Sequence, residues 1–209
     1  MFVIGLTGGI ATGKSLISSY LKEKGARIID ADVVAREVVE KGKPALQQLV
    51  QNFGREILNK DGSLNRKVLG SLVFKDTQKL SKLNKIIHPF IIDEIKKKIM
   101  KLSEEKYNQI VVLDAALLLE TGLEEIVDEV WLVVVDEKTQ LQRLLKRDRQ
   151  LNVEEAKQRI KSQMPMNLKM KKAHRIIDNN GSIKNTLDQV EKMWQNIIIN
   201  KSSTNDKTI

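Results

Sequence analysis

The chain has 209 residues, of which 41% are hydrophobic and 30% are charged, a balance typical of a globular protein and unlike that of a disordered one. Because it contains no cysteine, neither a disulfide nor a thiolate zinc site can form. The net charge of +9 attracts anions of every kind, but the aromatic residues on which many nucleic-acid binders stack bases make up only 4%. No apolar run approaches the roughly 20 residues of a membrane span, and the first residues lack a signal-peptide pattern. We therefore expect a cytoplasmic protein.

Short apolar runs alternate with helical patterns along the chain. Strands are expected at residues 2–6, 27–30, 109–114, 130–136 and 175–178. Helices are expected at residues 15–24, 137–149, 153–164 and 183–199, with Asn152 and Glu155 as a capping box for the third of these. Residues 33–106 are mostly helical in pattern, with breaks expected near residues 42–44, 54, 61–63 and 88–89.

This alternation predicts an α/β fold built on a five-stranded, doubly wound parallel sheet. The third and fourth strands are almost continuously apolar, which is typical of strands covered on both faces. The helical stretch between the second and third strands is too long for a simple crossover, so it predicts an inserted subdomain. In such sheets ligands bind beyond the carboxyl ends of the strands, and we expect the chemistry there.

Residues 8–15 match the phosphate-loop pattern G-x-x-x-x-G-K-[ST], with a strand before them and a helix after them. Glycines let the backbone N–H groups of such a loop turn toward a phosphate, and the helix N-terminus adds its dipole. Lys14 is expected to reach the β- and γ-phosphates, and the Ser15 hydroxyl to bind Mg²⁺. The residues predicted to bind ATP here are Gly8, Gly9, Ile10, Ala11, Thr12, Gly13, Lys14, Ser15 and Leu16. The alternative is a glycine-rich turn that matches by chance.

Carboxylates follow two of the predicted strands. Asp114 closes an apolar run, as a carboxylate that holds Mg²⁺ does, although a strand-end Asp can also cap a turn or a helix. Asp30 and Asp32 follow the second strand, where a carboxylate can orient a substrate hydroxyl or accept its proton. The two point the same way in an extended segment, whereas a helix starting at Ala31 separates them. The alternative role for Asp32 is a helix N-cap.

These features resemble the dephospho-CoA kinase family. The resemblance runs through nearly the whole chain in order, and it rests on several short motifs that are weak singly and specific together. They are residues 5–10 with Gly13, Lys14 and Ser15, then residues 30–32, 64–66, 72–74, 88–89, 117–122, 163–164 with Lys169, and 177–181. The resemblance implies transfer of the γ-phosphoryl group of ATP to the ribose 3′-hydroxyl of dephospho-CoA, with Mg²⁺. That reaction gives CoA and ADP and is the last step of CoA synthesis.

The resemblance also implies three working parts. A P-loop core would comprise residues 1–31, 107–136 and 173–200, a helical domain for the CoA substrate residues 32–106, and a lid residues 137–172, followed by a flexible tail at residues 201–209. Residues 138–172 of the predicted lid carry eleven basic residues against three acidic ones, a net charge of +8. A cationic lid that closes over a triphosphate neutralises charge and excludes water. The alternative is a solvated charged surface.

Family positions imply roles for individual residues. Asp32 would face the 3′-hydroxyl as its base or orienter, and Lys14 would act in catalysis. Arg143 and Arg147 lie four residues apart on one face of the predicted helix, so their spacing leads us to expect both at the triphosphate, with Arg143 acting in catalysis. Arg147 and Asn179 would bind ATP, and Arg66, His88, Leu117, Leu118 and Glu120, with Asp32, would bind the acceptor. The alternatives are a solvated Arg66, a structural His88 before Pro89, core leucines, and a turn at Asn179.

Two positions depart from the family pattern. Ala11-Thr12 stands where the family has Gly-Ser, and Ala116 stands where it has Pro. Because Ala11 carries a Cβ, we expect it to keep φ below zero, and we expect neither change to abolish activity.

Two other functions stay open. One is phosphorylation of a nucleoside or a nucleoside monophosphate, and the other is nucleotide-gated binding of nucleic acid, suggested only by the net charge. We expect no nucleic-acid or membrane partner, and a monomer or weak homo-oligomer.

Overall fold

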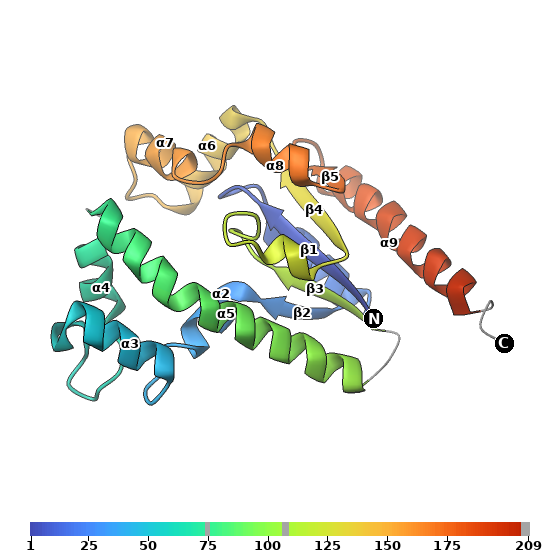
Figure 1. Cartoon of the computed structure of the whole chain (residues 1–209). Helices are drawn as coiled ribbons and strands as arrows, with labels where there is room; N and C mark the ends of the chain where they lie inside the picture. Colours follow the sequence, from blue (N-terminus) through green and yellow to red (C-terminus); the bar gives the residue numbers. More distant parts are fainter. Residues whose placement is uncertain (74–75, 106–108, 206–209) are drawn as a thin grey trace. The chain divides into compact units, whose positions relative to one another are not determined.

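The computed structural model describes residues 1–73, 76–105 and 109–205, with side chains described up to residue 199. These residues fall into two compact units (Figure 1). Met1 and residues 29–109 form the first, called here the helical unit, and residues 2–28 and 110–209 form the second, called the sheet unit. The insertion expected between the second and third strands is therefore a compact body of its own.

The sheet has five strands, in the order β2-β3-β1-β4-β5. Their bounds are β1 (Phe2–Gly8), β2 (Arg27–Asp30), β3 (Ile110–Asp114), β4 (Glu129–Val134) and β5 (Arg175–Asp178). The α/β fold with a five-stranded parallel sheet is confirmed. β1 is central, and its register pairs Leu6 with Asp114 of β3 and Gly8 with Val133 of β4. The carboxyl ends of β1, β3 and β4 therefore meet at one edge of the sheet.

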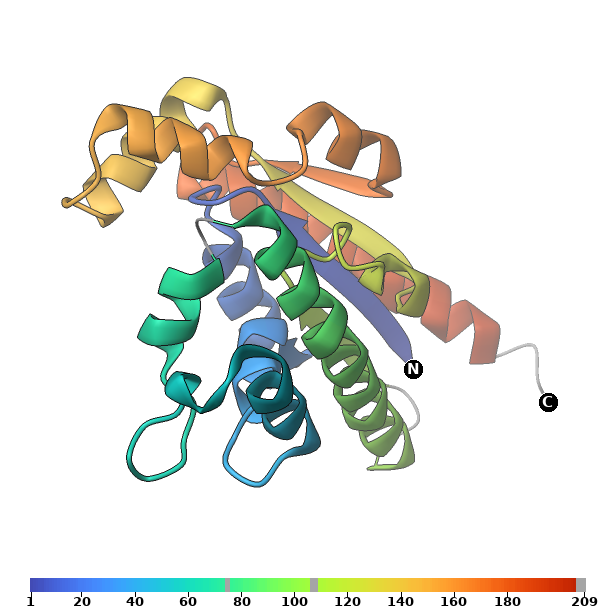
Figure 2. The same cartoon turned by 60° about the vertical axis from the view of Figure 1, so that its left-hand side comes forward.

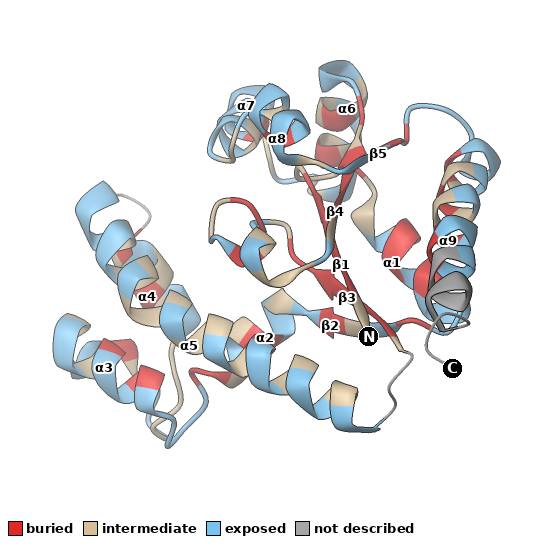
Figure 3. Cartoon of the chain, turned by 45° about the vertical axis from the view of Figure 1, so that its right-hand side comes forward, coloured by how far each residue is buried: buried red, intermediate tan, exposed pale blue. Residues whose placement is uncertain are grey.

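The core of the sheet unit lies around these three strands, whose buried residues appear red in Figure 3. Its largest members are Trp131 from β4 and Trp194 from α9 (Ile183–Asn205), which pack with Ile4, Leu6 and Val112. Both tryptophans of the chain lie in this cluster. The near-continuous apolar pattern of β1, β3 and β4 thus reflects strands buried on both faces.

α1 (Lys14–Glu23) and α9 pack against each other in the sheet unit. A polar cluster joins them on the outside, where Glu191 Oε2 accepts a hydrogen bond from Tyr20 Oη at 2.6 Å and lies 2.8 Å from Lys24 Nζ. α9 continues to Asn205, beyond the expected boundary at residue 200, and the last part of the expected tail, residues 206–209, lies outside the described residues.

Three helices follow β4: α6 (Glu137–Arg147), α7 (Val153–Lys161) and α8 (Met166–Lys172). The capping box of Asn152 and Glu155 is confirmed at the start of α7. The single helix expected over residues 153–164 is wrong at its end, because α7 stops at Lys161 and α8 begins after Pro165. Proline has no N–H to continue a helix but fits the position just before one, so Pro165 separates the two.

The helical unit contains α2 (Ala31–Glu37), α3 (Pro44–Phe53), the 3₁₀ turn η1 (Arg55–Ile57), α4 (Arg66–Val73) and α5 (Thr77–Glu105). α5 packs against α2, α3 and α4. The break expected at His88-Pro89 is wrong, because Pro89 lies inside α5. Proline removes one helical hydrogen bond. Pro89 is exposed, so the carbonyl that loses its partner one turn earlier can bond to water, and packing on three neighbouring helices holds α5 together.

Candidate functional site

The phosphate-loop motif lies between a strand and a helix, as its chemistry requires. β1 ends at Gly8, residues 9–13 form the loop, and α1 begins at Lys14. Thr12 closes the turn, since its backbone N and its Oγ1 both donate to the Gly9 carbonyl, at 3.2 and 2.8 Å. The loop therefore runs directly into the N-terminus of α1, where backbone N–H groups and the helix dipole favour an anion.

Two residues of the loop have positive φ. Gly13 has φ 89°, a conformation that glycine adopts without a Cβ clash. Ala11 has φ 61°, so the expectation that its Cβ would keep φ negative is wrong. The left-handed region costs a residue with a Cβ roughly 1–2 kcal/mol. Ala11 is the only non-glycine residue with positive φ in the part of the chain that the structure describes.

Side-chain amides from distant segments bond to the peptide groups of this loop. Gln140 Nε2, on α6, donates to the Ile10 carbonyl at 2.8 Å, and Gln163 Oε1, between α7 and α8, accepts from the Ile10 N–H at 2.7 Å. Asn179 Nδ2, just after β5, donates to the Thr12 carbonyl at 2.8 Å. The α6–α8 segment, yellow to orange in Figure 2, accordingly lies beside the blue phosphate loop.

The sequence reasoning missed Gln140 and Gln163. A signal for Gln140 existed, because it lies four residues before Leu144 on the face of α6 that is buried, where a polar residue needs a partner. Gln163 belongs to a motif already noted in the sequence, but no residue type near it indicated a role.

Lys14 and Asp114 form an ion pair. Asp114 is only 8% exposed and lies at the end of β3, beside β1, while Lys14 is the first residue of α1. Ser15 follows Lys14 on α1 and is exposed. The structure thus brings together the cation, the carboxylate and the hydroxyl-bearing helix start that the sequence pattern selected.

Arg143 also lies at the phosphate loop. Its Nη2 donates to the backbone carbonyl of Asn179 at 2.9 Å, and a Cβ built on Gly13 would lie 3.7 Å from its Nη1. The side chain of Asn179 is buried and occupied, because its Oδ1 accepts from Thr186 Oγ1 at 2.9 Å while its Nδ2 bonds to Thr12. Arg147, the last residue of α6, is exposed.

Glu120 holds a buried lysine. Its Oε1 lies 2.8 Å from the ammonium of Lys169, which is 0% exposed, and also accepts from the Met164 N–H at 3.0 Å. Lys169 donates as well to the Ala116 carbonyl at 3.2 Å. Glu120, Lys169 and Met164 thus join the loop after β3 to the segment that ends in α8.

The two leucines of that loop differ in burial. Leu117 is 46% exposed, whereas Leu118 is fully buried, against the backbone of Gly5. This favours the core interpretation for Leu118 and leaves Leu117 accessible to a ligand.

In the helical unit, Asp30 is the N-cap of α2. Its Oδ1 accepts from the backbone N–H groups of Asp32 and Val33, at 2.8 and 3.2 Å. The alternative that made Asp32 the cap is therefore wrong by two residues. Because the helix begins at Ala31, the two carboxylates diverge, and Asp32 is exposed in the first turn of α2.

The other two acceptor-side candidates of this unit lie on different helices. Arg66 is exposed at the start of α4, and its Nη2 lies 3.4 Å from the Arg36 carbonyl. His88 is partly buried in α5, and this burial lowers the pKa of its imidazole below the ordinary value of 6.5, so His88 is neutral at pH 7.

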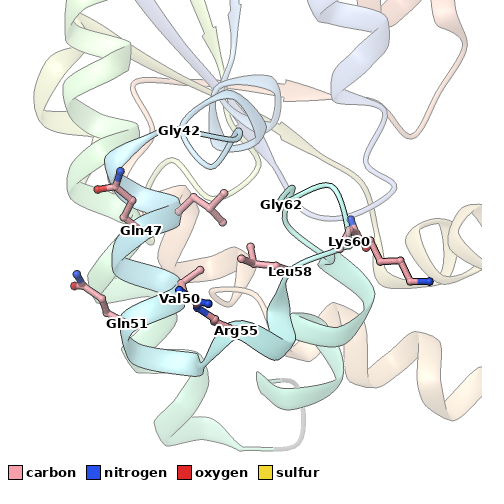
Figure 4. Close-up of a pocket in the computed structure, with 10 residues that line it drawn as sticks. Gly42, Gln47, Val50, Gln51, Arg55, Leu58, Lys60 and Gly62 are labelled. Atoms are coloured by element: carbon pink, nitrogen blue, oxygen red, sulfur yellow. The ribbon is translucent and has the colours of Figure 1, made fainter.

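A hollow of about 760 Å³ lies on the helical unit between α3, η1 and the turn that follows it (Figure 4). Its lining includes the apolar side chains of Val50 and Leu58 and the basic side chains of Arg55 and Lys60. None of the predicted site residues is among its lining residues.

Comparison with known proteins gives a consistent result. The model of the dephospho-CoA kinase family matches residues 2–185. A protein named dephospho-CoA kinase from Shouchella clausii is 51% identical over 187 residues, which is 90% of this chain and 94% of that protein. A solved structure of a dephospho-CoA kinase from Campylobacter jejuni is 28% identical, with a TM-score of 0.71 and coverage of 93% and 96%. The crystal structure of TT1252 from Thermus thermophilus is 27% identical, with a TM-score of 0.74 and coverage of 95% and 97%.

Proposed function

The chain belongs to the dephospho-CoA kinase family, and from that premise we propose how its residues carry out the reaction of the family. The reaction transfers the γ-phosphoryl group of ATP to the ribose 3′-hydroxyl of dephospho-CoA, giving CoA and ADP, the last step of CoA synthesis. The hydroxyl oxygen forms the new bond to phosphorus, the bond to the β,γ-bridging oxygen breaks, and the hydroxyl proton leaves. The observation that carries the assignment is the phosphate loop, with the Lys14–Asp114 pair at its end.

ATP binds, in this proposal, along residues 8–16. The N–H groups of the loop and of the first turn of α1 hold the β-phosphate, and the Lys14 ammonium contacts the β- and γ-phosphates. Arg143, which already lies against Gly13, neutralises charge on the transferring group. We assign Arg147 and the backbone of Asn179 to the rest of the nucleotide.

The residues at the loop fit Mg²⁺ by their chemistry. The Ser15 hydroxyl and the Asp114 carboxylate are oxygen donors, and Mg²⁺ in kinases takes one or two protein oxygens together with phosphate oxygens and water. No cluster of three or more His, Cys, Asp or Glu with metal-binding geometry occurs among the described residues. Mg²⁺ would neutralise charge on the phosphates.

Asp32 is the residue that we assign to the acceptor hydroxyl, as base or as orienter. Its carboxylate is exposed and is not used in capping α2, a role that belongs to Asp30. Arg66, neutral His88, Leu117 and Glu120 are assigned to the rest of dephospho-CoA, and Leu118 supports its neighbour Leu117 from the core of the sheet unit. Because phosphoryl transfer depends mostly on position and charge, the negative charge of Asp32, which orients the hydroxyl, contributes more than its basicity.

In the same proposal, residues 32–106 bind the CoA substrate and residues 137–172 form the lid. No described helix is both long and apolar enough to cross a membrane. We propose a cytoplasmic enzyme that acts as a monomer or weak homo-oligomer.

The test is ADP release with dephospho-CoA, nucleosides and nucleoside monophosphates as acceptors. We expect turnover with dephospho-CoA alone, and loss of turnover in Lys14→Ala. Equal turnover with a nucleoside monophosphate would overturn the assignment of the acceptor.

A further inference from the structure

The phosphate loop has two peptide groups that precede residues with positive φ. The Ile10–Ala11 peptide precedes φ 61°, and the Thr12–Gly13 peptide precedes φ 89°. Each carbonyl is bonded, at 2.8 Å, by a side-chain amide from outside the loop: Gln140 Nε2 for Ile10 and Asn179 Nδ2 for Thr12. The same arrangement, a side-chain amide that donates to the carbonyl preceding a residue with positive φ, therefore occurs twice within four residues.

The glycines of the loop leave space for these amides. A Cβ built on Gly9 would come within 2.7 Å of Gln140 Nε2, and one on Gly13 would collide with Asn179 Nδ2. Any side chain at Gly9 would therefore displace Gln140 from the loop. Gln140 is 5% exposed, so its amide is enclosed between α6 and the loop.

The carbonyl contact determines where the next N–H points. In a trans peptide the C=O and the following N–H point in opposite directions. When Gln140 holds the Ile10 carbonyl on the outside of the loop, the Ala11 N–H is turned to the inside, where a phosphate is bound. For Gly13 this orientation is free, but for Ala11 it needs the disfavoured left-handed conformation.

We propose that Gln140 is a positioning residue for nucleotide binding. Its amide holds the strained Ile10–Ala11 peptide in the orientation that presents the Ala11 N–H to the nucleotide phosphates. Gln163 assists from the other side by accepting from the Ile10 N–H at 2.7 Å. Because Gln140 lies on α6 and Gln163 precedes α8, the helices after β4 support the loop conformation itself. This inference rests on the proposed function, in which the loop binds ATP.

Two substitutions made singly and together test it. Gln140→Met keeps the size of the buried side chain and removes the donor, and Ala11→Gly removes the strain that the donor opposes. The readouts are the Kd of Mg²⁺-ADP by calorimetry and the separate KM values for ATP and dephospho-CoA. Gln142→Met is the matched control, since Gln142 is exposed on the same helix.

Gln140→Met is expected to raise the Kd of Mg²⁺-ADP and the KM for ATP about five- to tenfold, the loss of one hydrogen bond, with little change in the KM for dephospho-CoA. With Ala11→Gly also present, the same substitution is expected to raise the Kd less than about twofold. A purely structural role would lower thermal stability without this dependence on residue 11. Gln142→Met is expected to change neither value.

The proposal is overturned if Gln140→Met changes the Kd of Mg²⁺-ADP equally with and without Ala11→Gly, or if it changes this Kd in neither case. If Gln140→Met does not fold, Gln163→Met takes its place in the same double-mutant cycle with Ala11→Gly. A rise in the Kd of Mg²⁺-ADP that is smaller when Ala11→Gly is present supports the proposal. A rise that is equal with and without Ala11→Gly, or no rise at all, overturns it. Failure of the wild type to bind Mg²⁺-ADP would instead overturn the proposed function, so the two failures are distinct.

Discussion

Lys14, the first residue of α1, forms an ion pair with Asp114, the last residue of β3. The two are a hundred residues apart in the chain, and they meet because β1 and β3 are parallel neighbours whose carboxyl ends share one edge. In the proposed function, Mg²⁺-ATP would offer each a new partner of opposite charge, a phosphate for Lys14 and the cation for Asp114. The pair therefore holds both groups ready at the site while keeping either from being a buried charge without compensation.

The substitution Asp114→Asn tests two contacts of this carboxylate, the ion pair with Lys14 and the proposed contact with Mg²⁺. The amide cannot neutralise Lys14 or hold Mg²⁺ as a carboxylate does, so kcat is expected to fall roughly 100-fold, about 2.7 kcal/mol. The Mg²⁺ concentration for half-maximal rate is expected to rise, which a titration of Mg²⁺ at fixed ATP measures. An unchanged Mg²⁺ requirement would show that Asp114 only pairs with Lys14.

Asp30 and Asp32 are expected to differ in what their loss changes. Asp30→Ala removes the cap of α2 and should lower the free energy of unfolding by about 1 kcal/mol. Asp32→Asn should leave stability within about 0.5 kcal/mol and lower kcat roughly 100-fold. Urea unfolding and steady-state kinetics on both variants check this. Near-full kcat in Asp32→Asn would remove Asp32 from the reaction.

Lys169→Met is expected to destabilise the chain strongly. Breaking a buried ion pair by removing one partner costs about 3–5 kcal/mol, because the other charge stays buried. Adding Glu120→Leu should recover part of this loss, which a double-mutant cycle of unfolding free energies measures. If the losses of unfolding free energy of the two single variants simply add in the double variant, Lys169 and Glu120 are not coupled. If Glu120 also binds dephospho-CoA, the double variant should fold and yet show a raised KM for that substrate alone.

The Glu191 cluster predicts a dependence of stability on pH. Hydrogen bonds from Lys24, Tyr20 and Gln195 lower the pKa of Glu191 from 4.5 to about 2. A carboxylate whose pKa is lowered on folding stabilises the fold above its unfolded pKa and loses that contribution as pH falls through its folded pKa. The difference in unfolding free energy between wild type and Glu191→Gln should thus be full above pH 4.5 and vanish toward pH 2.

Much of the fold was predictable because local patterns specify it. The bounds of β2 and β5 agree with the sequence prediction to the residue, since short apolar runs between polar or glycine residues leave little choice. The phosphate loop was predictable because its chemistry allows few residues. α8 was missed because it is short and largely basic, without an apolar stripe to reveal it. The helix break predicted at Pro89 was wrong because the packing of α5 on three other helices outweighs the local tendency of proline to end a helix.

The support of the loop was not predictable. Gln140, Gln163 and Asn179 reach it across 130, 153 and 167 residues. The position of Gln140 on the buried face of α6 indicates that its amide needs a partner, but nothing local identifies that partner as the Ile10 carbonyl. The φ of Ala11 contradicts the local rule for a residue with a Cβ, and the contacts that we propose to stabilise it come from distant segments. The roles of Arg66, His88, Arg147 and Asp32 stay predictions.

Both tryptophans, Trp131 and Trp194, lie in the core of the sheet unit, and residues 29–109 contain none. Tryptophan fluorescence is therefore a signal from the sheet unit alone, while circular dichroism at the helical band records the unfolding of both units. Equilibrium unfolding followed by the two methods gives coincident curves if the units melt as one and separate curves if the insertion melts by itself. Because both indole rings lie in the sheet unit, the cooperativity of unfolding between the two units can be measured without attaching a fluorescent label.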